Sequence, residues 1–205
     1  MNSTERTTQE AILLAGKEEF LQKGFLGASL RNIVKNAGVT TGAFYGYYAS
    51  KEELFDALVG EQEAHFLSCF QMAQDDFSSL PPQKQPDNMG EISGTCISLL
   101  LDYMYEYPEE FRLLLCCSEG TKHAGFVHTL VEIEIEATNR FVQVLDTLGY
   151  STRPIDAQLE HMLVSGMFSA FFETVIHDMP KEQAVRYTKE LQEFYTAGWK
   201  KIMGL

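Results

Sequence analysis

The sequence has 205 residues, of which 45% are hydrophobic and 22% charged, so its composition is that of a folded protein rather than a disordered one. No apolar run approaches the roughly 18 residues that a membrane span needs, and the polar residues 1–10 argue against a secretory signal. These features predict a cytoplasmic protein with no membrane partner. The formal net charge of −13 by itself argues against nucleic acid, because a DNA-binding surface needs cations for the phosphates.

The charge is unevenly distributed along the chain. Residues 1–51 carry six Lys and Arg against four Asp and Glu, a net charge of +2, and residues 52–205 carry the remaining −15. A basic segment followed by an acidic one is consistent with a DNA-binding head on a body that binds something else. If only the head meets DNA, the affinity should be modest and strongly salt-dependent.

Four cysteines, at positions 69, 96, 116 and 117, lie in or beside apolar stretches. None forms a Cys-x-x-Cys pair or a Cys/His cluster with zinc-ligand spacing. They therefore predict buried free thiols, and the sequence indicates neither a metal site nor a cofactor.

Apolar residues recur with helical spacing almost throughout, which predicts an all-α fold of about nine helices. The tract 131–137 alternates like a strand, but both flanks keep helical spacing, so we expect a helix there. The proline-rich segment 78–88 reads as a loop. The expected helices, with their N-caps, cover 8–23, 29–37, 40–48, 50–77, 89–107, 108–117, 122–148, 154–177 and 180–203.

The first helix has a clear buried stripe and one anomaly. The stripe consists of Ile12, Ala15, Gly16 and Phe20. Glu19 interrupts it at a position where an apolar residue is expected. Gly24 should end the helix as its C-cap, which lets Phe25 dock back onto the core.

Residues 29–48 have the pattern helix, glycine-containing turn, short helix that is typical of a helix-turn-helix. Ser29 should cap the first helix of the pair, with Asn32 in place of the usual Glu, and Thr40 should cap the second. Phe44 and Tyr48 lie four apart on the inner face of that second helix. The rest of the helix offers glycines, Tyr and Thr, which stabilise a helix poorly but suit close approach to a nucleic-acid backbone.

Residues 8–55 resemble the DNA-binding domain of the tetracycline-repressor (TetR/AcrR) family. The residues that carry the resemblance are Ile12, Ala15, Phe20, Gly24, Ser29, Ile33, 37–48 (AGVTTGAFYGYY) and 50–54 (SKEEL). The resemblance implies a helix-turn-helix domain over 1–52 and a helical regulatory domain over 53–205. It also implies a ligand-responsive transcriptional regulator, in its commonest form a repressor released from a near-palindromic DNA operator by a small-molecule inducer.

The resemblance also assigns DNA-binding residues. Ser29 and Lys51 would meet phosphates, and Arg31 would touch a base or a phosphate. The residues expected in or at the major groove are Thr40, Thr41, Gly42, Ala43, Tyr45, Gly46 and Tyr47. Thr41 stands where the family often has Lys, and Gly46 where it often has an aromatic residue or His, so direct base readout should be sparse.

In the resembled family, the body binds a ligand among its middle helices and forms a homodimer through its last two. Here the segment 154–177 is apolar nearly all round, and the last helix has a second apolar stripe at 185, 188, 191, 195, 198 and 202. Together they suggest a symmetric four-helix interface. A monomer core could use the same residues, and the resemblance favours the dimer.

Candidate ligand contacts are aromatic, Met or acidic residues on inner helix faces: Tyr103, Tyr107, Phe111, Phe126, Glu134, Met162, Met167, Phe168 and Phe171. Glu134 lies on the apolar stripe of its helix, and a buried carboxylate there needs a partner. That partner could be a cationic ligand or one of His123, His128, Arg112 and Arg140, and the sequence favours the structural pairing.

Catalysis has little support, because the sequence contains no phosphate-binding glycine loop, zinc-protease motif or nucleophile elbow, and its five histidines are scattered. We therefore expect no enzyme and no catalytic residues. Two alternatives to the repressor stay open. One is a regulator of the same fold that activates transcription or answers to a protein, and the other is a helical protein without specific DNA binding.

Overall fold

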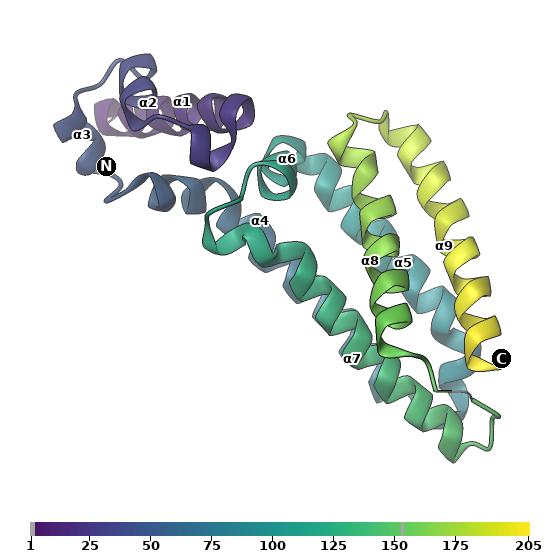
Figure 1. The fold of residues 1–205 in the computed structure, drawn as a ribbon. Coiled ribbons are helices and arrows are strands. Elements are labelled where there is room, and N and C mark those ends of the chain that lie inside the picture. The colour runs from purple at the N-terminus through teal and green to yellow at the C-terminus, as the bar shows by residue number, and fades with distance from the viewer. Residues whose placement is uncertain (1–2, 153) are drawn as a thin grey trace. The chain divides into compact units, whose positions relative to one another are not determined.

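The computed structural model describes residues 3–152 and 154–205, which form nine α-helices, two short 3-10 helices (η1, η2) and no strand (Figure 1). The all-α prediction is therefore confirmed, and the tract 131–137 lies within α7. The elements are α1 Ser3–Gly27, α2 Leu30–Asn36, α3 Thr41–Tyr45, α4 Lys51–Ser79, η1 Pro82–Lys84, α5 Gln85–Glu106, α6 Pro108–Cys116, η2 Lys122–Gly125, α7 Phe126–Thr147, α8 Ala157–Ile176 and α9 Lys181–Met203.

The chain folds into two compact units. Unit 1 combines residues up to 64 with residues 107–126, and unit 2 combines 65–106 with 127–205. The sequence placed a domain boundary after residue 52, so unit 1 extends further along α4 and also takes in α6 and η2. Helix α4 thus contributes its first part to one unit and its second part to the other.

Unit 1 has an aromatic core that α1 and α4 build together. The ring of Phe20 lies 5.1 Å from that of Phe55, and Phe25 lies 5.5 Å from Phe55. Gly24 leaves the helical region with φ 66°, where glycine is favoured, so the chain turns and Phe25 docks as predicted. A Cβ on Gly16 would lie 2.7 Å from a methyl carbon of Leu54, so this glycine lets α1 approach α4 closely.

Unit 2 is a helical bundle in which α9 contacts both α5 and α8 (Figure 1). Helix α8 supplies much of its core, since Phe168 packs against Phe70 with ring centroids 5.5 Å apart and Phe172 packs against Phe66. By length and composition alone α8 could cross a membrane, which the sequence analysis did not expect. Core helices of soluble proteins pass the same test, because burial on several sides demands the same apolar composition.

Several predicted boundaries were wrong by a few residues. Helix α5 begins at Gln85, inside the segment expected to be a loop, because Pro86 is tolerated in the first turn of a helix. Helix α8 begins after Asp156, whose side chain accepts the backbone N–H groups of Gln158 and Leu159, rather than at Pro154.

All four cysteines are free. Cys96 and Cys117 are buried as expected, and burial raises the pKa of the Cys96 thiol to about 12. Cys116 is exposed, contrary to the prediction, because it lies on the outer side of α6 next to the buried Cys117.

Candidate nucleic-acid interface and ligand cavity

The helix-turn-helix of unit 1 is formed by α2 and α3, and its inner face is as predicted. Phe44 and Tyr48 are buried and their rings contact each other. The hydroxyl of Thr40 accepts the backbone N–H of Ala43 at 3.1 Å and caps α3. The hydroxyl of Ser50 likewise accepts the N–H of Glu53 at 3.0 Å at the start of α4. Local capping therefore fixes where each helix begins.

The contacts of Glu19 explain why an acid interrupts the apolar stripe of α1 and why Asn32 can replace the usual Glu of the capping box. Its carboxylate is only 4% exposed and accepts the backbone N–H of Ser29, the side-chain amide of Asn32 and the ammonium of Lys23. The bond from Lys23, then that from Ser29, holds the pKa of this carboxyl below its ordinary value. The Ser29 hydroxyl does not cap α2, so Glu19 takes the part that a Glu at position 32 would have in a capping box.

Lys51 makes structural contacts within unit 1. Its ammonium donates to the carbonyl oxygens of Phe25 and Ala28, at 2.6 and 3.0 Å, and lies 4.4 Å from the centre of the Phe25 ring. Burial lowers the pKa of this amine. The phosphate contact suggested for Lys51 remains a prediction, and the ammonium already has protein partners.

The other predicted DNA contacts lie mostly on the surface. Arg31, Thr40, Thr41, Gly42, Tyr45 and Gly46 are exposed, whereas Ser29, Ala43 and Tyr47 are partly buried. A Cβ on Gly46 would lie 3.2 Å from the Ala43 carbonyl oxygen, a contact tighter than most Cβ atoms make. A Cβ on Gly42 would meet nothing closer than 3.9 Å, so nothing in unit 1 requires that glycine.

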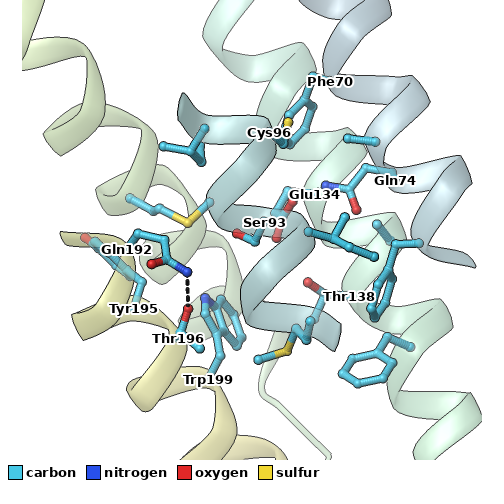
Figure 2. Close-up of a pocket in the computed structure, with 18 of the residues that line it drawn as sticks. Phe70, Gln74, Ser93, Cys96, Glu134, Thr138, Gln192, Tyr195, Thr196 and Trp199 are labelled. Atoms are coloured by element: carbon cyan, nitrogen blue, oxygen red, sulfur yellow. Dashed lines mark hydrogen bonds between the residues drawn. The ribbon is translucent and has the colours of Figure 1, made fainter. Parts of the chain in front are cut away.

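Unit 2 contains a cavity of about 130 Å³ enclosed by residues of α4, α5, α7, α8 and α9 (Figure 2). Aromatic and aliphatic side chains form most of its wall, among them Phe70, Phe77, Phe141, Phe171 and Trp199. A largely apolar cavity with a few polar groups is typical of a small-molecule site.

Glu134 is the acidic residue of this wall, and its partner within the protein is neither a histidine nor an arginine. The side-chain amide of Gln74 donates to its carboxylate at 2.7 Å, and Figure 2 shows the two side chains meeting from α7 and α4. Burial raises the pKa of the Glu134 carboxyl to about 7, the bond from Gln74 opposes this, and the nearby Glu160 adds to it. The structural pairing with His or Arg was therefore wrong, since the pairing is with a neutral amide.

Three of the nine predicted ligand residues line the cavity: Glu134, Met167 and Phe171. Phe168 is buried behind the wall against Phe70. Tyr103 lies at a separate hollow between α4 and α5, where its ring meets that of His65. Met162 is 70% exposed, so it points away from the bundle interior. Tyr107, Phe111 and Phe126 belong to unit 1, where both phenylalanines are core residues.

Most of the polar residues of the wall carry no signal in the sequence; they include Gln74, Ser93, Thr138, Thr188, Gln192 and Thr196. The Gln192 amide donates to the Gly90 carbonyl oxygen and to the Thr196 hydroxyl, at 2.9 and 3.2 Å (Figure 2). The cavity wall also includes three residues of the predicted dimer stripe of the last helix: Thr188, Leu191 and Tyr195. Their helical spacing indicated a buried face without indicating what that face covers.

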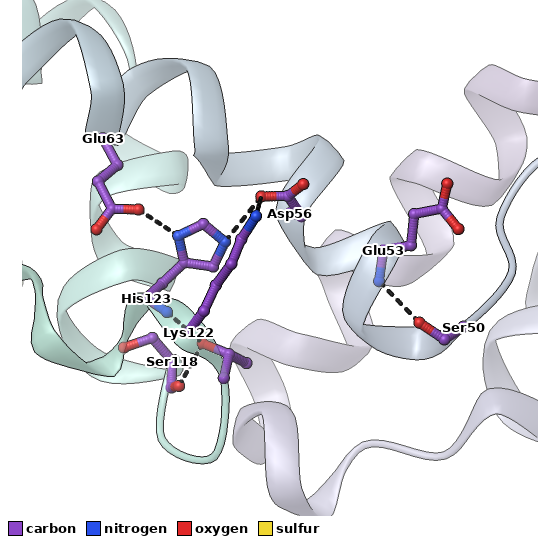
Figure 3. A network of polar contacts seen from close by, with 8 residues as sticks. Ser50, Glu53, Asp56, Glu63, Ser118, Lys122 and His123 are labelled. Atoms are coloured by element: carbon purple, nitrogen blue, oxygen red, sulfur yellow. Dashed lines mark hydrogen bonds and ion pairs between the residues drawn. The ribbon is translucent and has the colours of Figure 1, made fainter.

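A polar network holds η2 against α4 within unit 1 (Figure 3). The buried His123 ring lies between two carboxylates, with Nδ1 bonded to Glu63 and Nε2 3.1 Å from Asp56. The Lys122 ammonium lies 2.7 Å from the same Asp56 oxygen, and that contact holds the pKa of Asp56 below its ordinary value. The segment 107–126 is thereby fastened to the unit that carries the helix-turn-helix.

Comparison with known proteins identifies the N-terminal part of the chain. Residues 12–58 match the family described as bacterial regulatory proteins, tetR family. The HTH-type transcriptional repressor NemR of Escherichia coli (strain K12) is 38% identical over 68 residues, 33% of each chain. The HTH-type transcriptional repressor BepR of Brucella suis biovar 1 (strain 1330) is 42% identical over 53 residues, 26% of this chain and 25% of BepR. The matches thus span a third or less of these curated relatives.

Solved structures resemble the chain over nearly its whole length. A TetR-like transcriptional regulator from Rhodococcus sp. RHA1 has a TM-score of 0.54 and 19% identity, covering 93% of this chain and 96% of that one. The fatty acid degradation regulator FadR from Bacillus halodurans has a TM-score of 0.56 and 15% identity, with 92% and 98% covered. At such identity these likenesses show a shared fold.

Proposed function

We propose that this chain, whose residues 12–58 match the tetR family of bacterial regulatory proteins, is a DNA-binding transcriptional repressor and not an enzyme, and that a small molecule releases it from its operator. The observation that carries the proposal is the match of residues 12–58, which contain the whole helix-turn-helix with its exposed polar surface. The partial relatives NemR and BepR are both named as repressors. As an operator-binding protein it would act in the cytoplasm, where the DNA is.

The DNA-binding surface would be formed by α3 and the start of α2. Arg31 is an exposed cation that can reach a phosphate or a guanine edge, and the Tyr45 side chain is 54% exposed with a hydroxyl for hydrogen bonding. Gly42 leaves room for the DNA backbone to approach. Thr40, Thr41, Ala43, Gly46, Tyr47 and Ser29 complete the proposed contacts.

The protein would act as a homodimer through α8 and α9. Leu159, Met162 and Gly166 recur on one exposed face of α8, and Phe194 of α9 is 71% exposed. Apolar side chains of this size on two helices support a partner helix pair in a four-helix interface. A dimer would place two helix-turn-helix heads on the two halves of a near-palindromic operator.

Helix α4 is the proposed connection between ligand and DNA. Its residues Phe70, Gln74 and Phe77 line the cavity, and its residues Leu54 and Phe55 are core residues of the unit that holds α2 and α3. A ligand that binds one conformation of α4 more tightly would shift the equilibrium toward that conformation and so change the DNA-binding unit. The shift in free energy cannot exceed the ligand's difference in binding free energy between the two conformations.

Selection from a random-sequence DNA pool at moderate salt, followed by gel-shift titration of the recovered site, tests the proposal. We expect a near-palindromic site, and we expect Arg31→Ala to lower affinity. Because each of the two subunits would lose one phosphate contact, the slope of log affinity against log salt should fall by about two. Lys201→Ala, which removes the same charge from exposed α9, is the control and should leave the slope unchanged. Failure to enrich any sequence would refute the proposal.

The dimer has a separate test in solution. Light scattering at micromolar concentration should give twice the monomer mass, and Phe194→Glu should give the monomer mass with the helical content retained. A monomeric wild-type protein would rule out the interface on α8 and α9.

A further inference from the structure

The cavity of unit 2 contains an acid but no base. Glu134 contributes a carboxyl group to its wall, and no Lys, Arg or His is among the described residues that line it. The hydrogen bond that Glu134 receives comes from the neutral amide of Gln74. An ionised Glu134 therefore has no counter-ion within the cavity, and such a charge is costly in a low-dielectric interior.

A second polar group of the cavity wall has no hydrogen-bond partner. The Thr188 side chain is 5% exposed, and its Oγ1 atom is buried without a bond in the structure. Thr188 comes from α9 and Glu134 from α7, so one cavity is lined by an acid without a counter-ion and by an unbonded hydroxyl. Buried hydroxyls are nearly always bonded, so the unbonded Thr188 hydroxyl is available to a bound molecule that carries a polar group.

The apolar wall limits the size and shape of the occupant. An engineered cavity of about 150 Å³ holds benzene, so the cavity here, of about 130 Å³, fits a body of roughly six carbon atoms. Phe70, Phe77, Phe141 and Trp199 supply aromatic rings, whose faces attract a cation as well as apolar surface.

We propose that the ligand of this cavity is a small organic cation, a protonated primary or secondary amine on a compact apolar body, whose ammonium group pairs with Glu134. The inference rests on the proposed function only in that the ligand would be the inducer. An anionic ligand such as a fatty acid would place its carboxylate in a cavity with an acid and no cation, and repulsion disfavours it. A neutral ligand would leave the charge of Glu134 unpaired.

Three probes of nearly equal size and different charge test the proposal: benzylamine, benzyl alcohol and benzoate. Titration calorimetry on the full-length protein at pH 8, without DNA, should give benzylamine an affinity about tenfold or more above that of benzyl alcohol, because hydrogen bonds to ionised groups are the stronger ones. Benzoate should bind weakest. Equal or stronger binding of benzyl alcohol or benzoate in the wild-type protein would overturn the proposal, whether or not any variant folds.

Variants assign the charge recognition to one residue. Glu134→Gln keeps the shape and the acceptor for Gln74 and should bring benzylamine to within about threefold of benzyl alcohol. Glu136→Gln, two residues along α7, removes an exposed carboxylate that pairs with Arg140 and is the matched control. Loss of the benzylamine preference in the control, or its retention in Glu134→Gln, would contradict the assignment.

The release of the Glu134 proton when benzylamine binds can also be measured. A purely structural role of Glu134 would give no such release. The titratable groups that interact with Glu134 are Glu160 of α8 and Cys96 of α5. Binding an ammonium ion favours the ionised carboxyl, so benzylamine affinity should fall as pH decreases from 8 to 6, and calorimetry in two buffers should show protons released at pH 6. Glu134→Gln should abolish that release.

The two proposals fail separately. If benzylamine binds but no DNA sequence is selected, the repressor function is wrong and the ligand class stands. If DNA is bound and benzylamine binds no better than benzyl alcohol, the repressor function stands and the ligand class is wrong.

Discussion

The carboxylate of Glu19 on α1 accepts the backbone N–H of Ser29 at 3.0 Å, so an acid on one helix caps the helix that follows it. Ser29 precedes the first residue of α2, and Glu19 also binds the side chain of Asn32 in its first turn. A negative charge at a helix N-terminus is favoured by the helix dipole as well as by the free N–H groups. This bond therefore fixes how the helix-turn-helix attaches to α1.

Replacing Glu19 should destabilise the protein. Glu19→Ala would leave the Ser29 N–H and the Asn32 amide without their acceptor, and we expect a loss of about 2 kcal/mol in unfolding free energy, measured by urea denaturation. Glu18→Ala, an exposed acid next to it, is the control and should change little. An unchanged unfolding midpoint for Glu19→Ala would show that water replaces the carboxylate.

The pH dependence of that contribution follows from the pKa of Glu19, which is lowered in the folded protein chiefly by the bond from Lys23. A lowered acid pKa means that the stabilisation is present above the unfolded pKa and is lost as pH falls through the folded pKa. The difference in stability between wild type and Glu19→Ala should accordingly shrink in acid and stay constant near neutral pH.

Lys51 should matter for stability more than its place in the family pattern suggests. Lys51→Met removes two hydrogen bonds to the Phe25 and Ala28 carbonyl oxygens, and we expect a loss of about 1–2 kcal/mol in thermal or urea unfolding. Lys35→Met, which removes an exposed charge from α2, should cost little. If Lys51→Met instead leaves stability unchanged and lowers the salt dependence of DNA binding, its ammonium leaves the carbonyls to bind a phosphate.

Replacing Gly42 tests whether this glycine is needed for DNA binding or for folding. Because a Cβ at this position has room, Gly42→Ala should raise the unfolding free energy by up to about 1 kcal/mol. If the DNA backbone approaches this residue closely, the same change should weaken operator binding in gel-shift titration. A variant that gains stability and keeps full affinity would remove Gly42 from the interface.

Gly46→Ala provides the contrast. Its Cβ would lie 3.2 Å from the Ala43 carbonyl oxygen, so we expect a smaller gain in unfolding free energy than for Gly42→Ala. Equal gains for the two Gly→Ala variants in urea unfolding would show that this contact costs nothing.

The fold of the helix-turn-helix was predictable because its determinants are local. Thr40 and Ser50 cap their helices within three residues, and Gly24 interrupts α1 at a position where glycine is favoured. Apolar spacing of the helical period likewise identified α7 despite the alternation within it. These signals lie within single turns of the chain and need no knowledge of tertiary contacts.

The cavity was only partly predictable because its wall comes from five helices. Glu134 stood out as an acid on an apolar stripe, but its partner Gln74 lies 60 residues away and carries no signal of its own. Thr188 and Tyr195 belong to a stripe that periodicity marks as buried, and only the tertiary fold shows that both residues line the cavity. Periodicity identifies a buried face, and the neighbouring helices decide what that face contacts.

Glu134 should reduce stability at neutral pH in the empty protein. Its pKa is raised from the ordinary value of 4.5 to about 7, chiefly by burial, so between these pH values the folded state keeps a proton that the unfolded state has lost. The stability of the folded protein that depends on protonated Glu134 is therefore fully present below about pH 4.5. It is lost as the pH rises through about 7. Glu134→Gln should consequently be more stable than wild type at pH 8, by up to about 3 kcal/mol, and nearly equal to it at pH 5.

The measurement is a pair of urea unfolding curves at each pH, with Glu136→Gln as the control for removing an acid from α7. Glu160, whose pKa burial also raises, interacts with Glu134, so part of the gain at pH 8 comes from removing the repulsion between these two carboxylates. A Glu134→Gln variant that is less stable than wild type at pH 8 would mean that the carboxylate has a stabilising partner in the free protein. If it is more stable, the acid is retained at a cost to the fold, as expected when a group is kept for binding rather than for stability.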